Sequence, residues 1–471
     1  MKSIKRLLTS AEQQELHLLI EREPTLPNIL DGLHRLGGKA FLVGGVVRDL
    51  ILGRTLKDID IEVHGLSIDA LRQVLIQFGI VNLVGRSFGV LKFQGKGDLE
   101  LDWSLPRSDA PGRKPKVDLN PDMDIVQALR RRDLTMNAMA INLSTHELID
   151  PFGGESDIEE GYLRCPDKNL FVEDPLRFYR VMQFVARFEM KTAGELHELC
   201  KAMDVNTVSI ERVDEEFRKM LLKSNRPSLG LRWLYDIGRL SELFPELSAL
   251  VSVPQSAEHH PEGNVFEHTC QVVDAAATLK DLKESDRVVI LFAALCHDMG
   301  KKEATHYTSQ GRITSRGHEE VGVPVARAFL KRITYGQKII RIVTKLVRYH
   351  MHPLTFVTSK AKPKAYKKLA KKLAPETDLR MLSYLFEADR RGRNGASSDP
   401  LPGPIPDADF FRKQSKQAGV YAGPEQPVLS GDDIRHLVEP GPEMGRLLDK
   451  AYEIQIIQGV QDKERIIAQL V

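Results

Sequence analysis

The sequence predicts an α+β protein, in which a strand-rich N-terminal part is followed by a long helical remainder. Between residues 39 and 151, short apolar and β-branched runs alternate with turn residues, a pattern typical of strands. From residue 174 onward, apolar residues recur with the period of an α-helix. The 471 residues, 42% of them apolar, suffice for about three domains with cores of their own.

The composition excludes several classes of protein. Lys and Arg number 67 against 65 Asp and Glu, so the net charge of +2 allows a nucleic acid or a small anion as partner and requires any basic surface to be local. The four cysteines form no close CxxC pair, which indicates neither a disulfide framework nor a structural zinc module. The longest apolar run, residues 288–296, is too short for a bilayer, which needs roughly 18 residues. We therefore expect a cytoplasmic protein without a membrane partner.

The elements follow in order along the chain. An N-terminal helical stretch precedes strands in AFLVGG, DIDIEVHG, SFGVLKFQG, LELDWSL and MAINLS. Helices with breaks at PSLG and FPEL fill residues 174–244, and a helical, histidine-containing stretch covers residues 259–393. The predicted parts are a head (1–155), a helical neck (156–250), a helical domain (251–395), a linker or irregular segment (396–430) and a C-terminal helical segment (431–471).

A glycine turn and a carboxylate pair mark the first candidate site. In FLVGGVVRD a strand leads through Gly44 and Gly45 into a helix with Arg48 and Asp49, and such a turn lets backbone N–H groups approach a phosphate. Downstream, alternation places Asp58 and Asp60 on one face of a strand. Two carboxylates on one face repel each other unless cations lie between them, and two-metal phosphoryl transfer uses this arrangement.

A third carboxylate is expected from LELDWSL, where Asp102 and Glu100 are both candidates. An isolated Asp-x-Asp pair more often lies on a solvated edge strand, but the glycine turn upstream favours the metal site. Further along, RRRDLTMNA places three cations beside Asp133 and Asn137, which alone would indicate a solvated helix end.

Taken in order, GGVVRD, DID, RRRDLTMNA, EDPLRFYRVMQFVARF and ERVDEEFRKML resemble the motifs of class II nucleotidyltransferases, that is, bacterial CCA-adding enzymes and poly(A) polymerases. The resemblance implies a polymerase-beta-like head in which Asp58 and Asp60 hold Mg²⁺ and Asp102 matches the third carboxylate. It also implies a nucleotide site. Its residues would be Gly45 and Arg48 at the triphosphate, Gly44 and Asp49 shaping the turn, and Arg132, Asp133 and Asn137 at phosphate and ribose. Residues 106–124 match the family's flexible loop, and their polar, Pro-rich composition predicts mobility.

The EDPLRFYR segment carries the residues that would choose the base. Guanidinium groups and a carboxylate can present donors and an acceptor to a base edge, although a helix-surface ion pair is the alternative. In the family that this segment resembles, the Asp and first Arg of EDxxR select cytosine or adenine. They correspond to Asp174 and Arg177, with Arg180 adding a contact. Many relatives carry a third Arg one turn on, where this chain has Gln183 and loses the charge.

A second candidate site consists of histidines and aspartates. The adjacent pair His297 and Asp298 ends an apolar helix, and imidazole with carboxylate suits a divalent transition metal that activates water. The series resembles an HD phosphohydrolase domain, whose ligands correspond to His268, His297, Asp298 and Asp389. Further positions remain open: either His350 or His352 continues the series, His318 and His350 are candidates for a second metal, and His259, His260 and His306 are read as ordinary histidines, each satisfied in the core or on the surface.

These resemblances imply an enzyme that adds CCA to the 3′ end of tRNA from CTP and ATP, with no stable protein partner. Its HD site, holding a metal such as Ni²⁺ or Mn²⁺, would act as a phosphatase and 2′,3′-cyclic phosphodiesterase. The alternatives are an A-adding, CC-adding or poly(A) polymerase relative, mainly an HD phosphohydrolase acting on RNA ends, or a non-catalytic RNA-binding protein. Seven lysines within residues 360–374 indicate either an RNA-phosphate patch or a solvated helix face.

Overall fold

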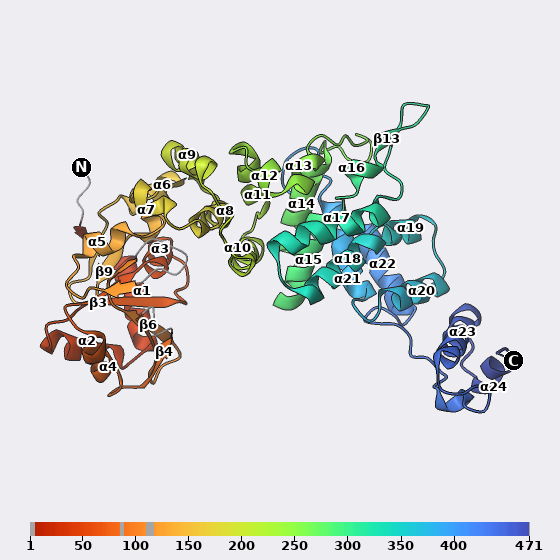
Figure 1. The fold of residues 1–471 in the computed structure, drawn as a ribbon, viewed down its shortest axis with the longest axis horizontal. Helices are drawn as coiled ribbons and strands as arrows, with labels where there is room; N and C mark the ends of the chain where they lie inside the picture. Colours follow the sequence, from red (N-terminus) through yellow and green to blue (C-terminus); the bar gives the residue numbers. More distant parts are fainter. Residues whose placement is uncertain (1–4, 85–88, 110–116, 471) are drawn as a thin grey trace. The chain divides into compact units, whose positions relative to one another are not determined.

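The computed structural model describes residues 5–84, 89–109 and 117–470 (Figure 1). Contacts divide the chain into two compact units, Met1–Val208 and Ser209–Val471. The predicted α+β class is confirmed, with a mixed sheet in the first unit and helices dominating the second. The unit boundary falls inside the predicted neck, and the five-part division stays a prediction.

The first unit is built on an eight-stranded sheet with the order β1-β10-β9-β2-β3-β6-β5-β4. Within it β3 and β6 are parallel and the other neighbours antiparallel. The strands are β1 (Lys5–Leu7), β2 (Lys39–Val43), β3 (Ile59–His64), β4 (Ile80–Val84), β5 (Val90–Gln94), β6 (Glu100–Ser104), β9 (Ala140–Asn142) and β10 (Glu147–Ile149).

Alternation along the central strands separates a core face from a polar face. Ile59, Ile61 and Val63 of β3 are buried in the main core of this unit, together with Leu101 and Trp103 of β6. Apolar residues of three helices complete the same core: α1 (Ser10–Arg22), α2 (Leu26–Arg35) and α4 (Ile68–Leu75). Because neighbouring side chains point to opposite faces, the acidic residues of β3 and β6 lie on the other side of the sheet.

The segment 106–124 forms an antiparallel ribbon of β7 (Arg107–Asp109) and β8 (Val117–Leu119). The predicted mobility of this loop falls mainly on residues 110–116, which lie outside the described residues. The first unit also contains shorter helices and strands, the last of which belong to the predicted neck. They are α3 (Gly45–Ile51), α5 (Ile125–Arg130), η1 (Thr135–Asn137), α6 (Gly154–Glu160), β11 (Tyr162–Leu163), α7 (Lys168–Val172), α8 (Leu176–Phe188), β12 (Lys191–Thr192) and α9 (Gly194–Ala202).

The second unit is helical around α15, whose last nine residues are all buried. The predicted breaks at PSLG and FPEL lie where α11 and α13 begin, and a proline suits a first helical turn because its missing N–H needs no partner there. The elements are α10 (Ile210–Lys223), α11 (Ser228–Asp236), α12 (Leu240–Leu243), α13 (Pro245–Leu250), α14 (Val265–Thr278), α15 (Glu284–Cys296), α16 (Lys301–Ala304), β13 (His306–Tyr307), β14 (Ile313–Thr314), α17 (His318–Ile333), α18 (Gln337–Tyr349), α19 (His352–Thr358), α20 (Pro363–Leu373), α21 (Leu379–Arg391) and α22 (Pro406–Gln417).

The expectation of an irregular segment over residues 396–430 is wrong for its middle part, which forms α22. The Pro, Gly and Ser content of the flanks hid a helical stretch in which Ala408, Phe411 and Ser415 are buried. Phe411 packs against the rings of Phe356, Tyr366 and Phe386, so this helix belongs to the core of the unit.

The C-terminal segment forms η2 (Asp432–Ile434), α23 (Pro442–Gln458) and α24 (Lys463–Ile467), with a small apolar core of its own. Two lysines of the basic stretch on α20 pair with acids further along the chain, one just before this segment and one on α23. Lys367 pairs with Glu425 at 2.8 Å, and Lys371 pairs with Asp449 at 2.9 Å. Part of the lysine charge is thus used inside the unit. Among the described residues, no helix has both the length and the apolar character needed to cross a bilayer.

Candidate active sites

The glycine turn of the first unit joins β2 to α3 and needs glycine at its first position. Gly44 has φ +78°, a conformation that residues with a Cβ rarely adopt. A Cβ on Gly44 would lie 2.5 Å from Nη1 of Arg132, and one on Gly45 would lie 3.3 Å from Nη2 of Arg48. The turn therefore brings two guanidinium groups against the backbone at the start of α3, which is the place for an anion.

Three carboxylates gather beside this turn. Asp60 on β3 is the register partner of Asp102 on the parallel strand β6, and Asp58 immediately precedes β3. Burial, with repulsion from Asp102, Asp58 and Glu62, raises the pKa of Asp60 to about 6, although Arg132 opposes the rise. Oδ1 of Asp102 is buried and accepts no hydrogen bond, while Nζ of Lys92 lies 3.5 Å away. Mutually repelling, under-paired carboxylates are a donor set that fits hard divalent cations such as Mg²⁺.

The structure separates the two candidates for the third carboxylate. Glu100 lies two residues earlier on β6, its side chain is 61% exposed, and it pairs with Lys92 at 2.9 Å. Asp102 lies directly beside Asp60. The geometry therefore favours Asp102.

A chain of buried hydrogen bonds joins the turn to the neck helix α8. Arg48, which is 5% exposed, donates through Nη1 to Oδ1 of Asn137 at 2.6 Å and through Nε to Asp49 at 2.9 Å. Asn137 in turn donates to Oδ1 of Asp133 at 3.0 Å, and Arg180 of α8 donates through Nε to Oδ2 of Asp133 at 2.6 Å. Burial alone would raise the pKa of Asp133, but Arg180 and Asn137 lower it to about 2. Asp133 therefore stays charged and holds Arg180 in place.

The remaining nucleotide-selecting candidates lie at the start of α8. Oδ1 of Asp174 accepts from the backbone N–H of Leu176 at 3.1 Å, so this carboxylate also caps the helix. Arg177 donates to the carbonyl oxygens of Leu170 and Arg131, which tie it to the head segment that follows α5. The structure thus places Asp174 and Arg177 within one turn of each other at the start of α8.

Gln183, the position at which the charge is lost, is 1% exposed. Its Oε1 accepts from Nη1 of Arg187, one turn further along α8, at 3.4 Å. The guanidinium groups of Arg187 and Arg180 both lie over the ring of Phe184, at 5.8 and 5.3 Å from its centre. This chain therefore has a buried amide at this position, and Arg187 places a guanidinium group beside it.

Sequence reasoning missed the acid that continues the carboxylate row. Glu62 is 2% exposed, and Nε2 of His64 lies 3.0 Å from its Oε1, while Nδ1 of His64 lies 2.8 Å from the carbonyl oxygen of Met123. Burial favours the neutral form, but His64, Arg132 and Arg131 lower the pKa of Glu62. The period-two alternation that identified Asp58 and Asp60 also reaches Glu62, so the signal was present in the sequence.

The second site lies in the second unit, where five helices bring histidines and aspartates together. Its members are His268 on α14, His297 and Asp298 after α15, His318 at the start of α17, His350 after α18 and Asp389 on α21. All six are at most 6% exposed. Two groups of three within this set have donor atoms close enough to share an ion: His268, His297 and Asp298, and Asp298, His318 and His350.

Asp298 lies between two histidine pairs. Its Oδ2 is 3.2 Å from Nε2 of His297 and 3.6 Å from Nε2 of His268. Its Oδ1 is 3.2 Å from Nε2 of His318 and 3.7 Å from Nε2 of His350. Asp389 approaches from the other side, with Oδ1 3.1 Å from Nε2 of His268. One carboxylate can thus serve both histidine pairs.

The imidazole rings are oriented for metal binding. Nδ1 of His297, His318 and His350 each contacts a backbone carbonyl oxygen at 2.6 to 2.8 Å. A carbonyl only accepts, so each of these Nδ1 atoms carries a proton, which leaves Nε2 as the nitrogen that can bind a metal ion. The Nε2 atoms then face one another, at 3.3 Å between His268 and His297 and at 3.0 Å between His318 and His350. Nitrogens that close need a proton or a cation between them, and imidazole nitrogens with carboxylate oxygens form a donor set that fits a divalent transition metal.

Two cations hold the carboxylates in their ionised form. Lys301 lies 2.7 Å from Oδ2 of Asp298, and Arg393 donates to both carboxylate oxygens of Asp389 at 2.9 Å. Burial opposes ionisation, but His297 and Lys301 hold the pKa of Asp298 well below its usual range, and Arg393 and His268 do the same for Asp389.

The structure also decides between neighbouring histidines. His350 belongs to the cluster, whereas His352 begins α19 and packs its ring against Tyr349 at 5.1 Å. His260, which the sequence analysis treats as an ordinary histidine, lies beside the site: its ring centre is 4.8 Å from that of His268, and its Nδ1 contacts Glu262 at 2.9 Å. No periodicity marks this loop residue, and only the fold brings it to the site.

Fold and sites together define a nucleotidyltransferase-type head joined to a helical region with an HD-type site, and comparison with known proteins agrees. Residues 40–164 match the family of the poly(A) polymerase head domain, residues 187–250 match the family described as the probable RNA and SrmB-binding site of polymerase A, and residues 265–390 match the HD domain family.

Curated relatives cover nearly the whole chain. The multifunctional CCA protein of Methylococcus capsulatus is 34% identical over 426 residues, which are 87% of this chain and 92% of that protein. The multifunctional CCA protein of Pasteurella multocida is 34% identical over 77% of this chain and 86% of that protein. This chain belongs to the family of multifunctional CCA proteins.

Solved structures share the fold at lower identity. The Bacillus stearothermophilus CCA-adding enzyme in complex with CTP has a TM-score of 0.64 and 20% identity, over 96% of each chain. The Thermotoga maritima CCA-adding enzyme complexed with tRNA has a TM-score of 0.59 and 19% identity, over 99% of this chain and 98% of that chain.

Proposed function

We propose that this protein adds C, C and A to the 3′ end of tRNA, using CTP and ATP. The observation that carries the proposal is the pairing of Asp60 with Asp102 in register, on the polar face of the sheet and beside the Gly44 turn. Membership in the multifunctional CCA protein family supports the choice of substrate. We place the protein in the cytoplasm, where tRNA and nucleoside triphosphates are available.

In this proposal Asp58, Asp60 and Asp102 hold Mg²⁺, which when bound activates the terminal RNA hydroxyl and stabilises charge on the leaving pyrophosphate. Arg48 and Arg132, held against the glycine turn, bind the triphosphate from the opposite side. The ribose hydroxyl forms a bond to the α-phosphorus as the bond to the β-phosphate oxygen breaks. The three aspartates thus hold the metal, and the two guanidinium groups neutralise part of the charge on the triphosphate.

Selection of the base falls to α8 in this proposal. Asp174 supplies an acceptor, and Arg177 and Arg180 supply donors, to the edge of cytosine or adenine. Because Asp133 fixes Arg180 and links it through Asn137 to Arg48, the base-reading and phosphate-binding groups form one connected set. Gln183 carries no charge, so the positive groups that this helix offers to the nucleotide are Arg177, Arg180 and the neighbouring Arg187.

Labelled nucleotides test the head. Purified protein is incubated with tRNA that lacks its 3′ CCA, with CTP alone, ATP alone and both. We expect two C residues from CTP and a terminal A only when both are present. Incorporation of ATP alone into tRNA ending in CC would identify an A-adding relative, and long A tails would identify a poly(A) polymerase. Loss of all incorporation in Asp58→Ala, with His297→Ala retaining it, would assign the reaction to the head.

A second function is favoured by the buried histidine and aspartate cluster. We propose a phosphohydrolase site, in which His268, His297, Asp298 and Asp389 hold a transition metal such as Ni²⁺ or Mn²⁺ that supplies an activated water. The position of Asp298 between two histidine pairs supports a second metal on His318 and His350. The substrates would be phosphomonoesters and 2′,3′-cyclic phosphates of nucleotides or RNA ends, and Lys301, 2.7 Å from Oδ2 of Asp298, adds a positive charge to the site.

The test follows hydrolysis of a 2′,3′-cyclic nucleotide by the metal-stripped protein after Ni²⁺, Mn²⁺ or Mg²⁺ is added back. We expect activity with the transition metals and its loss in His297→Ala. If none of the metals restores hydrolysis to the wild-type protein, this second function is refuted and the nucleotidyltransferase proposal is unaffected.

A further inference from the structure

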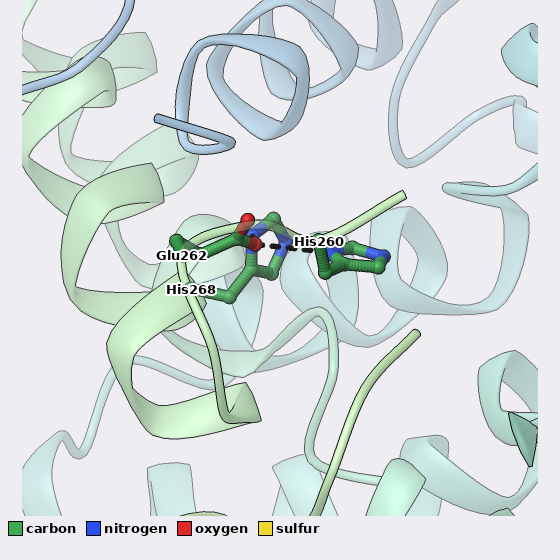
Figure 2. Close-up of side chains that lie close together, drawn as sticks. All are labelled: His260, Glu262 and His268. Carbon is green, nitrogen blue, oxygen red and sulfur yellow. Dashed lines mark hydrogen bonds and ion pairs between the residues drawn. The ribbon is translucent and has the colours of Figure 1, made fainter. Parts of the chain in front are cut away.

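One buried carboxylate near the second site is not a member of the ligand set. Glu262 lies in the loop before α14, and its side chain is 0% exposed. Its Oε1 lies 2.7 Å from Nδ1 of His268 and 2.9 Å from Nδ1 of His260, so one oxygen contacts two imidazole rings (Figure 2). A buried charge is costly unless it is paired, so this carboxylate is held at a specific position.

The contact decides which nitrogen of His268 is available. Nδ1 of His268 also lies 3.0 Å from the carbonyl oxygen of Gly392. Both neighbours are acceptors, so Nδ1 carries a proton, which leaves Nε2 as the nitrogen that can bind a metal ion. That Nε2 faces His297 at 3.3 Å and Asp389 at 3.1 Å.

His268 differs from the other histidines of the site in where its Nδ1 partners come from. The other three histidines lie at helix ends, and each Nδ1 contacts the carbonyl oxygen of the residue three positions earlier. His268 lies inside α14, and both groups that contact its Nδ1, Glu262 and the carbonyl oxygen of Gly392, come from outside that helix. The orientation of this ring therefore depends on residues from other parts of the chain.

We propose that Glu262 is a positioning residue for the metal of the HD site. It orients His268 and, as a carboxylate on the far nitrogen, makes Nε2 a stronger donor to a divalent cation. His260 is the second donor that keeps Glu262 in place. This inference rests on the proposed metal-dependent function of the site and adds a residue outside its ligand set.

The test measures metal affinity of the full-length protein, not activity. Metal is removed with a chelator, the head is saturated with excess Mg²⁺, and Co²⁺ is titrated while its visible absorption is recorded. In Glu262→Gln, which keeps the shape but removes the charge, Co²⁺ should bind about 10- to 100-fold more weakly, the usual cost of losing such an outer carboxylate. Glu267→Gln is the matched control, because this neighbour on α14 pairs with Arg232 at 2.6 Å, and we expect its affinity within twofold of wild type.

Thermal unfolding of the metal-free proteins distinguishes the positioning role of Glu262 from a purely structural one. Under the proposal, Glu262→Gln weakens Co²⁺ binding far more than Glu267→Gln does, even at similar thermal stability. Wild-type Co²⁺ affinity in Glu262→Gln, or an equal loss in the control, would overturn it. Should Glu262→Gln fail to fold, Glu262→Asp decides, since a shorter carboxylate should lower affinity, and unchanged affinity counts against the role. If the wild type binds Co²⁺ yet hydrolyses no phosphoester, the proposed hydrolase fails while this comparison remains valid.

Discussion

Replacing Asp133 by Asn tests whether the buried network of the head supports nucleotide addition. At present Oδ1 of Asp133 accepts hydrogen bonds from the side chain of Asn137 at 3.0 Å and from the backbone N–H of Leu134 at 2.8 Å. The oxygen of an Asn side chain can accept both of them. Its NH₂ group then takes the place of Oδ2 and faces the guanidinium of Arg180, so that donors meet donors. Arg180 should therefore leave its present position.

The size of the effect follows from the charge. The pKa of Asp133 falls from its ordinary 3.8 to about 2, despite its burial, because of Arg180 and Asn137. At 1.36 kcal/mol for each pKa unit, this lowering corresponds to about 2 kcal/mol of stabilisation. A hydrogen bond to a charged group contributes a similar amount, about 1.5–3 kcal/mol. If Arg180 contacts the nucleotide, kcat/KM should fall roughly 10- to 100-fold.

The assay measures kcat/KM for CTP and for ATP separately, together with thermal unfolding followed by two probes because the chain has two units. Asp157→Asn is the control: Asp157 is also buried and pairs with an arginine, Arg164, elsewhere in the unit. It should lower stability but change kcat/KM less than threefold. Because the pKa of Asp133 is depressed, its contribution is complete above about pH 4 and lost as the pH falls toward 2. Values of kcat/KM within threefold of wild type for both nucleotides would refute the reasoning.

Further predictions concern the turn and the acids. Asp102→Asn should lower nucleotide incorporation on the order of 10³-fold, because a metal ligand contributes several kcal/mol, whereas Glu100→Gln should change it less than threefold; the reverse ranking would make Glu100 the third carboxylate. Gly44→Ala should raise KM for the nucleotide in steady-state kinetics, because a Cβ there meets the guanidinium of Arg132; Gly53→Ala, also at a positive φ but with nothing within 4 Å of the added Cβ, should leave KM unchanged. The pKa of Asp60 is raised to about 6, so below that pH protons compete with Mg²⁺ and the Mg²⁺ concentration needed for half-maximal incorporation should rise; a requirement independent of pH between 5 and 8 contradicts this.

Local patterns predicted much of the molecule because they depend on neighbours in sequence. Alternation identified β3 and its acidic face, and helical period with an apolar run identified α15 and the His297–Asp298 pair at its end. The helix α22 was not predicted, because proline and glycine in its flanks masked a short amphipathic stretch. Its burial depends on aromatic rings distant in sequence.

The sequence by itself determined the α+β class, the motif order and most of the polar residues of both sites, since turns, strands and helix ends are set by residues a few positions apart. Only the tertiary structure placed Asp102 directly beside Asp60 and His350 in the histidine cluster, and brought His260 and Glu262 to His268. Strand register and the convergence of separate helices join residues far apart along the chain. Such pairings depend on how whole elements bury their apolar faces, and no local spacing encodes them.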